Sequence, residues 1–188
     1  MTVSFSSFAH GYMDELTQKI KELDLKELEK FVDAIVNTKG KIYIIGNGGS
    51  SATASHMAND LSIGLKRRGK KALDAVSLSD NSAVCFAIAN DIGFENTFYM
   101  QLKDIVTPND LVIAISCSGN SDNIVKAAEY AKSEGVSIVG ITGFDGGALK
   151  ELSDIKIHIE TAHGKYGIVE DLHLMVNHMV YSYLLESL

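Results

Sequence analysis

The stretch KIYIIGNGGSSATASHMAND, residues 41–60, decides the fold. It begins with a β-branched and aromatic run typical of a strand, passes through the turn Gly46-Asn47-Gly48-Gly49, and continues with small residues at helical spacing. Glycine permits positive φ and leaves backbone amides exposed, and Ser50 is expected to cap the helix that follows. Because a helix N-terminus favours an anion, the turn predicts a site for a phosphate-bearing ligand.

This turn matches neither of the common nucleotide motifs. It lacks the lysine of the G-x-x-x-x-G-K-[ST] loop, and its spacing differs from the G-x-G-x-x-G of dinucleotide folds. By itself the turn is also compatible with a tight strand-to-helix connection that holds no ligand. The rest of the chain has to decide between these two interpretations.

The composition describes an ordinary globular protein. Its 188 residues are 46% hydrophobic and 22% charged, which is enough for a proper core. A net charge of −7 argues against a nucleic-acid surface, because binding to a phosphate backbone needs a positive face. The basic cluster at residues 66–71 is interpreted as a solvated connection, with a nucleic-acid patch or a contact to an anionic substrate as alternatives. No stretch approaches the roughly 20 apolar residues of a membrane span, so no membrane partner is expected.

The two cysteines indicate a reducing compartment. Cys85 and Cys117 sit in apolar or glycine-serine settings, without the C-x-x-C spacing of zinc-thiolate sites. No N-terminal stretch combines the basic and apolar regions of a signal peptide. The sequence therefore predicts a cytoplasmic protein.

Strands alternate with helices along most of the chain. Five strands are predicted, at residues 41–45, 72–76, 111–115, 136–141 and 155–159. This alternation predicts an α/β fold, a five-stranded parallel sheet with helices on both faces. The last strand alternates apolar and polar residues, so we expect it at an edge of the sheet with His158 exposed to solvent.

Two helices are expected before the first strand. Apolar residues recur at helical spacing over residues 7–38, and Asp24 and Glu27 have the spacing of a capping box, which predicts a break between the helices. The last helix, residues 168–185, is apolar on more than one side, and packing against another subunit would bury it. The predicted organisation is a single domain over residues 1–188, with a helical extension at 1–38 and an α/β core at 39–188.

A second polar turn follows the third predicted strand. In Ser116-Cys117-Ser118-Gly119-Asn120-Ser121, three serines accompany exposed backbone amides and make a nest for phosphate oxygens. A capped helix start without a ligand is the alternative. Ligands of parallel sheets bind at the carboxyl ends of the strands, where both polar turns would lie.

Two helices carry side chains that are capable of chemistry. His56 and Asp60 are four residues apart, the spacing of a two-residue metal site or of an oriented acid–base pair. At about 100° per residue, Glu170 lies about 80° from His178 and about 60° from His173, so the carboxylate and one histidine are expected to face a common space. The alternative for this last helix is a polar stripe that is simply wet.

The order of these motifs resembles the phosphoheptose isomerase family of sugar isomerase (SIS) domain proteins, which convert sedoheptulose 7-phosphate to a heptose 7-phosphate. The resemblance covers nearly the whole chain. It implies a flavodoxin-like sheet, a sugar phosphate as substrate, and a homotetramer that uses the N-terminal helices for oligomerisation and has its sites at subunit junctions. The motifs are Gly46-Asn47-Gly48-Gly49-Ser50, His56-x-x-x-Asp60, Asn90-Asp91-x-Gly93-Phe94, the turn at residues 116–121, and Glu170-x-x-His173 with His178.

The resemblance also implies roles for individual residues. Contacts with the sugar phosphate are implied for Asn47, Gly48, Gly49, Ser50, Asn90 and Asp91, and contacts with the phosphate itself for Ser116, Cys117, Ser118 and Ser121. One Zn²⁺ per subunit, or the proton transfers, are implied for His56, Asp60, Glu170 and His178. Of these, the residues expected to be catalytic are Asp60, Glu170 and His178.

This chain departs from the family pattern at several of these positions. Asp60 stands where the family usually has glutamate, Glu170 where it usually has glutamine, and Cys117 where threonine is common. Gly64 and Gly167 replace an arginine and an aspartate. Two hypotheses follow: either the role of base has moved from Asp60 to Glu170, or both carboxylates join the two histidines in a tighter metal site that suits Zn²⁺, with Mn²⁺ or Fe²⁺ as alternatives.

The implied reaction is an aldose–ketose isomerisation that gives D-glycero-D-manno-heptose 7-phosphate, a precursor of lipopolysaccharide or capsule, through an enediol. A carboxylate would remove the proton next to the carbonyl, and His178 would exchange a proton with the oxygen. Two alternatives stay open. One is a non-catalytic SIS protein that binds a phosphosugar, of the kind that associates with a replication initiator, and the other is an isomerase for a different phosphosugar.

Overall fold

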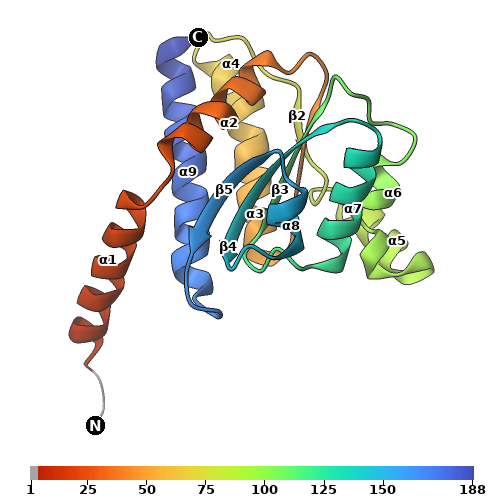
Figure 1. Cartoon of the computed structure of the whole chain (residues 1–188). Helices are drawn as coiled ribbons and strands as arrows, with labels where there is room; N and C mark the ends of the chain where they lie inside the picture. Colours follow the sequence, from red (N-terminus) through yellow and green to blue (C-terminus); the bar gives the residue numbers. More distant parts are fainter. Residues whose placement is uncertain (1–3) are drawn as a thin grey trace.

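A parallel sheet of five strands forms the centre of the molecule (Figure 1). The computed structural model describes residues 4–188; residues 1–3, which belong to the predicted extension, lie outside the described part. The strands run in the order β2-β1-β3-β4-β5, the order of flavodoxin-like sheets, and this confirms the predicted fold class. Their bounds are β1 Ile42–Gly46, β2 Ala75–Ser77, β3 Leu111–Ser116, β4 Ser137–Phe144 and β5 Ile155–Glu160.

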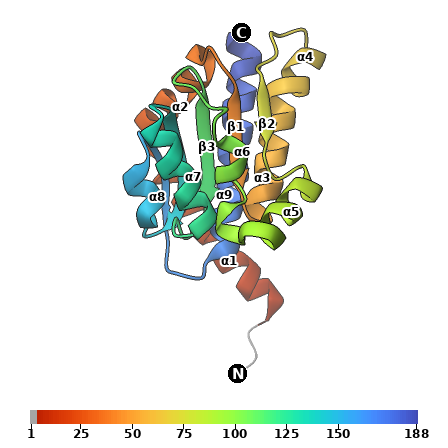
Figure 2. The ribbon, with the colours of Figure 1, turned by 90° about the vertical axis from the view of Figure 1, so that its right-hand side faces the viewer.

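Helices cover both faces of this sheet (Figures 1 and 2). The helices of the described chain are α1 Phe5–Lys21, α2 Leu25–Asn37, α3 Gly48–Asn59, α4 Leu65–Arg67, α5 Ser82–Ile92, α6 Tyr99–Leu102, α7 Asp122–Ser133, α8 Gly147–Leu152 and α9 Tyr166–Ser187, with a π-helical turn at Asp60–Gly64 and a 3₁₀ turn at Phe94–Asn96. Helix α1 extends away from the sheet (Figure 1). Within residues 4–188, none of the helices combines the length and the apolar character that a membrane span requires.

The central strands are buried on both sides, and for this reason their sequences are continuously apolar. All residues of β1 and β3 are buried. Ile42 and Ile44 point to the face covered by α2, α3 and α9, whereas Tyr43 and Ile45 point to the face covered by α6, α7 and α8. The period of two along each strand therefore separates two apolar layers.

Helix α3 begins earlier than the sequence predicts, and Ser50 does not cap it. The N-cap residue is Asn47, with extended φ and ψ of −109° and 152°, and its side chain makes no capping hydrogen bond. Gly48 enters the helix with a φ of +53°, a conformation that glycine adopts without strain. The turn is therefore complete within two residues, and Ser50 lies buried inside the first helical turn.

His158 on the edge strand β5 is half-buried, so the prediction of an exposed residue was wrong. The β4–β5 register places His158 opposite Thr142, and the two side chains share a hydrogen bond of 3.0 Å between Nδ1 and Oγ1. Burial lowers the pKa of His158. The alternation of apolar and polar residues identifies which residues of an edge strand face away from the core. It does not identify the side chains that cover those residues.

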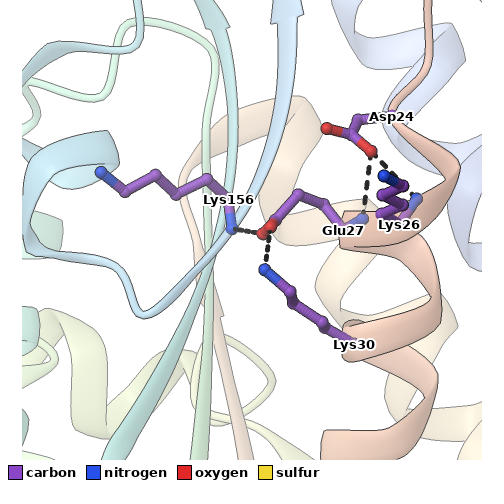
Figure 3. Close-up of polar contacts among 5 residues, drawn as sticks. All are labelled: Asp24, Lys26, Glu27, Lys30 and Lys156. Atoms are coloured by element: carbon purple, nitrogen blue, oxygen red, sulfur yellow. Dashed lines mark hydrogen bonds and ion pairs between the residues drawn. The ribbon is translucent and has the colours of Figure 1, made fainter.

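The break predicted between the first two helices is present at Asp24, whose carboxylate accepts hydrogen bonds from the backbone N–H groups of Lys26 and Glu27 at 2.9 and 3.3 Å. The capping box is only half formed, because the Glu27 carboxylate turns towards β5 (Figure 3). It accepts a 2.9 Å hydrogen bond from the Lys156 backbone N–H and a 2.5 Å contact from Lys30 Nζ. Helix α2 is thereby fastened to the edge of the sheet.

Removing the Glu27 charge is expected to destabilise the protein. The hydrogen bonds that Glu27 accepts lower the pKa of its carboxyl group below the ordinary 4.5, first through Lys156 and then through Lys30. This contribution is present above pH 4.5 and is lost as the pH falls through the lowered folded-state value. Glu27→Gln should cost about 1–2 kcal/mol of unfolding free energy at neutral pH, measured by urea denaturation.

The matched control is Glu29→Gln, which changes an exposed carboxylate on the same helix. It should leave the unfolding free energy within about 0.5 kcal/mol of the wild type. Equal losses for the two variants at neutral pH, or a Glu27→Gln loss that persists in full at acid pH, would contradict the assigned contact.

Candidate active site

The two polar turns lie side by side at the carboxyl edge of the sheet. Strands β1 and β3 are neighbours, and their register pairs Gly46 with Ile115, so that both strands end at the same level. The chain continues from β1 to one side of the sheet and from β3 to the other, which makes this place the topological switch point of the fold. A cavity of about 160 Å³ opens there and is lined by Asn47, Ser50, Ile115, Ser116, Cys117, Ser118, Ser121, Tyr166 and Glu170.

The second turn is held open by its own hydroxyl groups. Ser116 Oγ accepts a hydrogen bond from the Gly119 N–H at 3.1 Å, and Ser118 Oγ accepts one from the Asn120 N–H at 3.2 Å. Gly119 has a φ of +64° and leaves room for the carbonyl of Gly146. Hydroxyl and amide groups of this turn thus line part of the cavity, and groups of this kind bind phosphate oxygens.

An amide pair connects the two turns. Asn47 Nδ2 donates to Asn123 Oδ1 at 2.8 Å, and Asn123 Nδ2 donates to Asn47 Oδ1 at 2.9 Å. Asn123 lies in the first turn of α7 and is only 1% exposed. These hydrogen bonds occupy the side chain of Asn47, which makes no capping hydrogen bond to α3.

The Glu170 carboxylate reaches into this cavity from α9. A Cβ atom on Gly49 would lie 2.5 Å from the carboxylate atoms, so glycine at position 49 is what admits this side chain to the N-terminus of α3. That helix end is a favourable place for negative charge. Cys117 Sγ is 4.0 Å from Glu170 Oε1, and burial first, then the Glu170 charge, raises the pKa of the Cys117 thiol from 9.0 to about 11.

A separate group of three side chains is suited to a metal ion. One ligand atom from each of His56, Asp60 and His178 lies within 4.8 Å of the other two. His56 Nε2 is 3.4 Å from Asp60 Oδ2 and 3.3 Å from His178 Nε2. Two imidazoles and a carboxylate are the donor set of many zinc sites with an open position.

The carboxylate of this group is oriented from behind. Asn177 Nδ2 donates a 2.9 Å hydrogen bond to Asp60 Oδ2, and both residues are buried. Asp60 opens the π-helical turn, an irregularity that often accompanies functional residues. This hydrogen bond holds the Asp60 carboxylate in one orientation.

The predicted common space for Glu170 and a histidine is not formed within residues 4–188. Glu170 lies in the serine-lined cavity, and His178 lies in the histidine–aspartate group eight residues further along α9. Eight residues rise about 12 Å along a helix, so a small angular difference does not bring the two side chains together. His173 is buried, and its desolvation lowers its pKa to about 4.

The remaining predicted positions lie outside the cavity. Asn90 and Asp91 are exposed at the end of α5, where Asn90 Nδ2 donates to Asp91 Oδ1 at 2.8 Å. A Cβ atom at Gly64 would meet the Tyr181 hydroxyl at 3.0 Å, and one at Gly167 would meet the hydroxyl of Tyr12, also at 3.0 Å. Tyrosine hydroxyls thus occupy the space beside both of these glycines.

Sequence reasoning missed Asn123 and did not foresee that Tyr166 lines the cavity. Asn123 occupies the first turn of a helix, where a polar side chain is ordinary and gives no signal. Tyr166 is the first residue of α9, and its ring packs edge-on against Phe144 with centroids 5.0 Å apart. Neither position is distinguished by a motif.

Comparison with known proteins identifies the family of this chain. The SIS domain model matches residues 9–143. A phosphoheptose isomerase from Fusobacterium nucleatum is 40% identical over 172 residues, which cover 88% of this chain and 86% of the relative. The chain belongs to the phosphoheptose isomerase family of SIS domain proteins.

Further relatives of this SIS domain agree in sequence and in fold. A phosphoheptose isomerase from Helicobacter pylori is 37% identical over 168 residues, covering 89% of this chain and 85% of the relative. The structure of a phosphoheptose isomerase from Neisseria gonorrhoeae superposes with a TM-score of 0.84 at 24% identity, covering 96% of this chain and 99% of the other. The family inferred from the ordered motifs is confirmed.

The contact between Cys117 and Glu170 predicts a change in thiol acidity. In a Cys85→Ser background, Glu170→Gln should lower the pKa of Cys117 below about 11 but leave it above 9.0, because burial is the larger cause of the rise. Titration by the pH dependence of the rate of Cys117 alkylation with iodoacetamide measures this pKa. Glu186→Gln, an exposed carboxylate on the same helix, is the control and should leave the titration unchanged; a titration unaffected by Glu170→Gln would show that the carboxylate is not beside the thiol.

Proposed function

We propose that this protein is an aldose–ketose isomerase that converts sedoheptulose 7-phosphate to D-glycero-D-manno-heptose 7-phosphate through an enediol. The observation that carries the proposal is a carboxylate, Glu170, in a cavity at the switch point of the sheet whose lining includes four serines and Asn47. Membership of the phosphoheptose isomerase family supports the choice of substrate. In this arrangement the carboxylate supplies the base, and the neighbouring serine turn supplies the anchor for the phosphate.

The phosphate end of the substrate is assigned to the serine turn. Ser116, Ser118 and Ser121 contribute hydroxyl groups, and the first turn of α3 adds backbone N–H groups and its dipole. Ser50 and Cys117 line the same cavity, and Gly48 and Gly49 form the start of α3, next to Asn47. Binding the unreacting phosphate supplies energy that orients the carbonyl end of the sugar.

Glu170 is assigned as the base. Its carboxylate removes a proton from the carbon next to the carbonyl and returns it to the former carbonyl carbon, while a second proton passes from the hydroxyl to the carbonyl oxygen. Hydrogen-bond donors along the cavity stabilise the negative oxygen of the intermediate. The hypothesis that the base has moved from Asp60 to Glu170 is supported, because Asp60 is buried and already engaged by Asn177 and His56.

His56, Asp60 and His178 are assigned to one Zn²⁺ per chain. The closeness of their ligand atoms and the hydrogen bond from Asn177 support this assignment. A bound zinc ion would supply a Lewis acid for a substrate oxygen. The proton exchange expected of His178 is not assigned within one chain, because His178 lies eight residues, about 12 Å along α9, from Glu170.

Association into homotetramers in the cytoplasm is part of the proposal. Large apolar side chains on α1 stand in solvent, with Phe5 82%, Phe8 59% and Met13 52% exposed, and burial of this surface would favour assembly. Asn90 and Asp91, which lie away from the cavity of their own chain, keep their proposed substrate role only at a junction between subunits. Both cysteines are free thiols, which agrees with a reducing compartment.

The assignment of the base predicts the kinetics of one variant. Glu170→Gln should lower kcat for sedoheptulose 7-phosphate by about 10²–10⁴-fold, because it removes the group that accepts the carbon-bound proton. Glu186→Gln makes the same change on an exposed turn of the helix and should keep wild-type activity. A coupled assay for the aldose product measures both. Full activity of Glu170→Gln would refute the assignment, and a wild type that binds the sugar phosphate without turnover would favour a sensor or a different substrate.

The metal assignment predicts zinc affinities. Metal-stripped wild type should bind one Zn²⁺ per chain in calorimetry, His178→Ala should lose this binding, and Asn177→Ala should weaken it about 10–100-fold by releasing Asp60. His10→Ala, which removes an exposed histidine on α1, is the control. Zinc binding that survives His178→Ala unchanged would place the metal elsewhere.

A further inference from the structure

The amide pair between Asn47 and Asn123 joins the two halves of the cavity. Asn47 ends the first turn and stands directly before α3, whereas Asn123 stands in the first turn of α7, two residues after Ser121. The residues are 76 positions apart, and both amide groups donate and accept, at 2.8 and 2.9 Å. The β1–β3 register ends at Gly46 and Ile115, before the positions of this pair.

The environment makes this pair more than a surface contact. Asn123 is 1% exposed, so water cannot replace Asn47 as its partner without a rearrangement of the turn. A buried amide that loses its partner pays its full desolvation cost. Asn47 is half-buried and lines the cavity, and after pairing it retains one N–H and one oxygen lone pair for a ligand.

We infer that Asn123 is a positioning residue for the sugar phosphate: it holds Asn47, and with it the amide end of α3, at a fixed distance from the serine turn. This inference rests on the proposed function for the identity of the ligand. Asn123 acts through Asn47, whereas Asn47 presents its remaining hydrogen-bonding capacity to the cavity. A phosphate group that bridges the two turns must contact both turns at the same time. Loss of the Asn47–Asn123 pair would therefore let the two halves of one binding site move apart.

The expected result is a loss of affinity with little change in turnover. Asn123→Ala should raise the Kd for inorganic phosphate and the KM for sedoheptulose 7-phosphate about tenfold, the effect of about one hydrogen bond, while kcat changes less than about threefold. Ser153→Ala is the matched control, because it also removes a buried side-chain hydrogen bond, from Ser153 Oγ to the Leu149 carbonyl, but at the C-terminal end of α8. It should lower stability without a change in either constant.

A double-mutant cycle separates positioning from a general loss of stability. In an Asn47→Ala background, Asn123→Ala should have no further effect on phosphate affinity, because the partner through which it acts is gone. An equal effect of Asn123→Ala in both backgrounds, or unchanged Kd and KM in the wild-type background, would overturn the inference. If Asn123→Ala does not fold, two other variants remove the same hydrogen bonds. Asn123→Ser leaves a smaller cavity, and Asn47→Ala makes the change at a more exposed position.

Inorganic phosphate binding, measured by calorimetry, keeps this test apart from that of the proposed function. A wild type that fails to turn over sedoheptulose 7-phosphate, but whose phosphate affinity falls in Asn123→Ala, would refute the proposed substrate and sustain the positioning role. A wild type with turnover whose KM is unaffected by Asn123→Ala would sustain the proposed function and refute the positioning role.

Discussion

The pairing of β1 with β3 is the constraint on which the site depends. These two strands are adjacent and parallel, and their last paired residues are Gly46 and Ile115, so the turns that follow them leave the sheet at one level. Every residue of both strands is buried, and a slip by one residue would turn each apolar side chain to the wrong layer. The core that stabilises the fold thus also sets the separation of the turns that line the cavity.

Sequence patterns identified the parts of this architecture that follow from local chemistry. The strands, the glycine turn and the serine turn are all encoded by neighbouring residues, and their carboxyl-edge location follows from the rules for parallel sheets. Contacts between residues far apart in the sequence could not be predicted from neighbouring residues. Asn47 was expected to meet a ligand, yet its first partner is Asn123, and Ser50 lost its predicted capping role because Gly48 closed the turn earlier.

Helix α9 shows a second limit of reading from periodicity. Angular position places Glu170 and His178 on similar sides of the helix, but distance along the axis, about 12 Å, separates them into two groups. Glu170 joins Cys117 and Gly49, whereas His178 joins His56 and Asp60. Which neighbours each side chain meets depends on where α3 crosses α9, a tertiary fact that no single helix contains.

The fastening of α2 to the outer strand has a consequence for the behaviour of the protein at high concentration. An edge strand with free backbone N–H groups is a template for another chain, and pairing of this kind leads to fibrous aggregates. The Glu27 carboxylate occupies the Lys156 N–H on β5 and places a negative charge where an incoming strand would offer a carbonyl. The contact that locates α2 therefore also occupies one backbone donor of the β5 edge and disfavours the addition of a strand from another chain there.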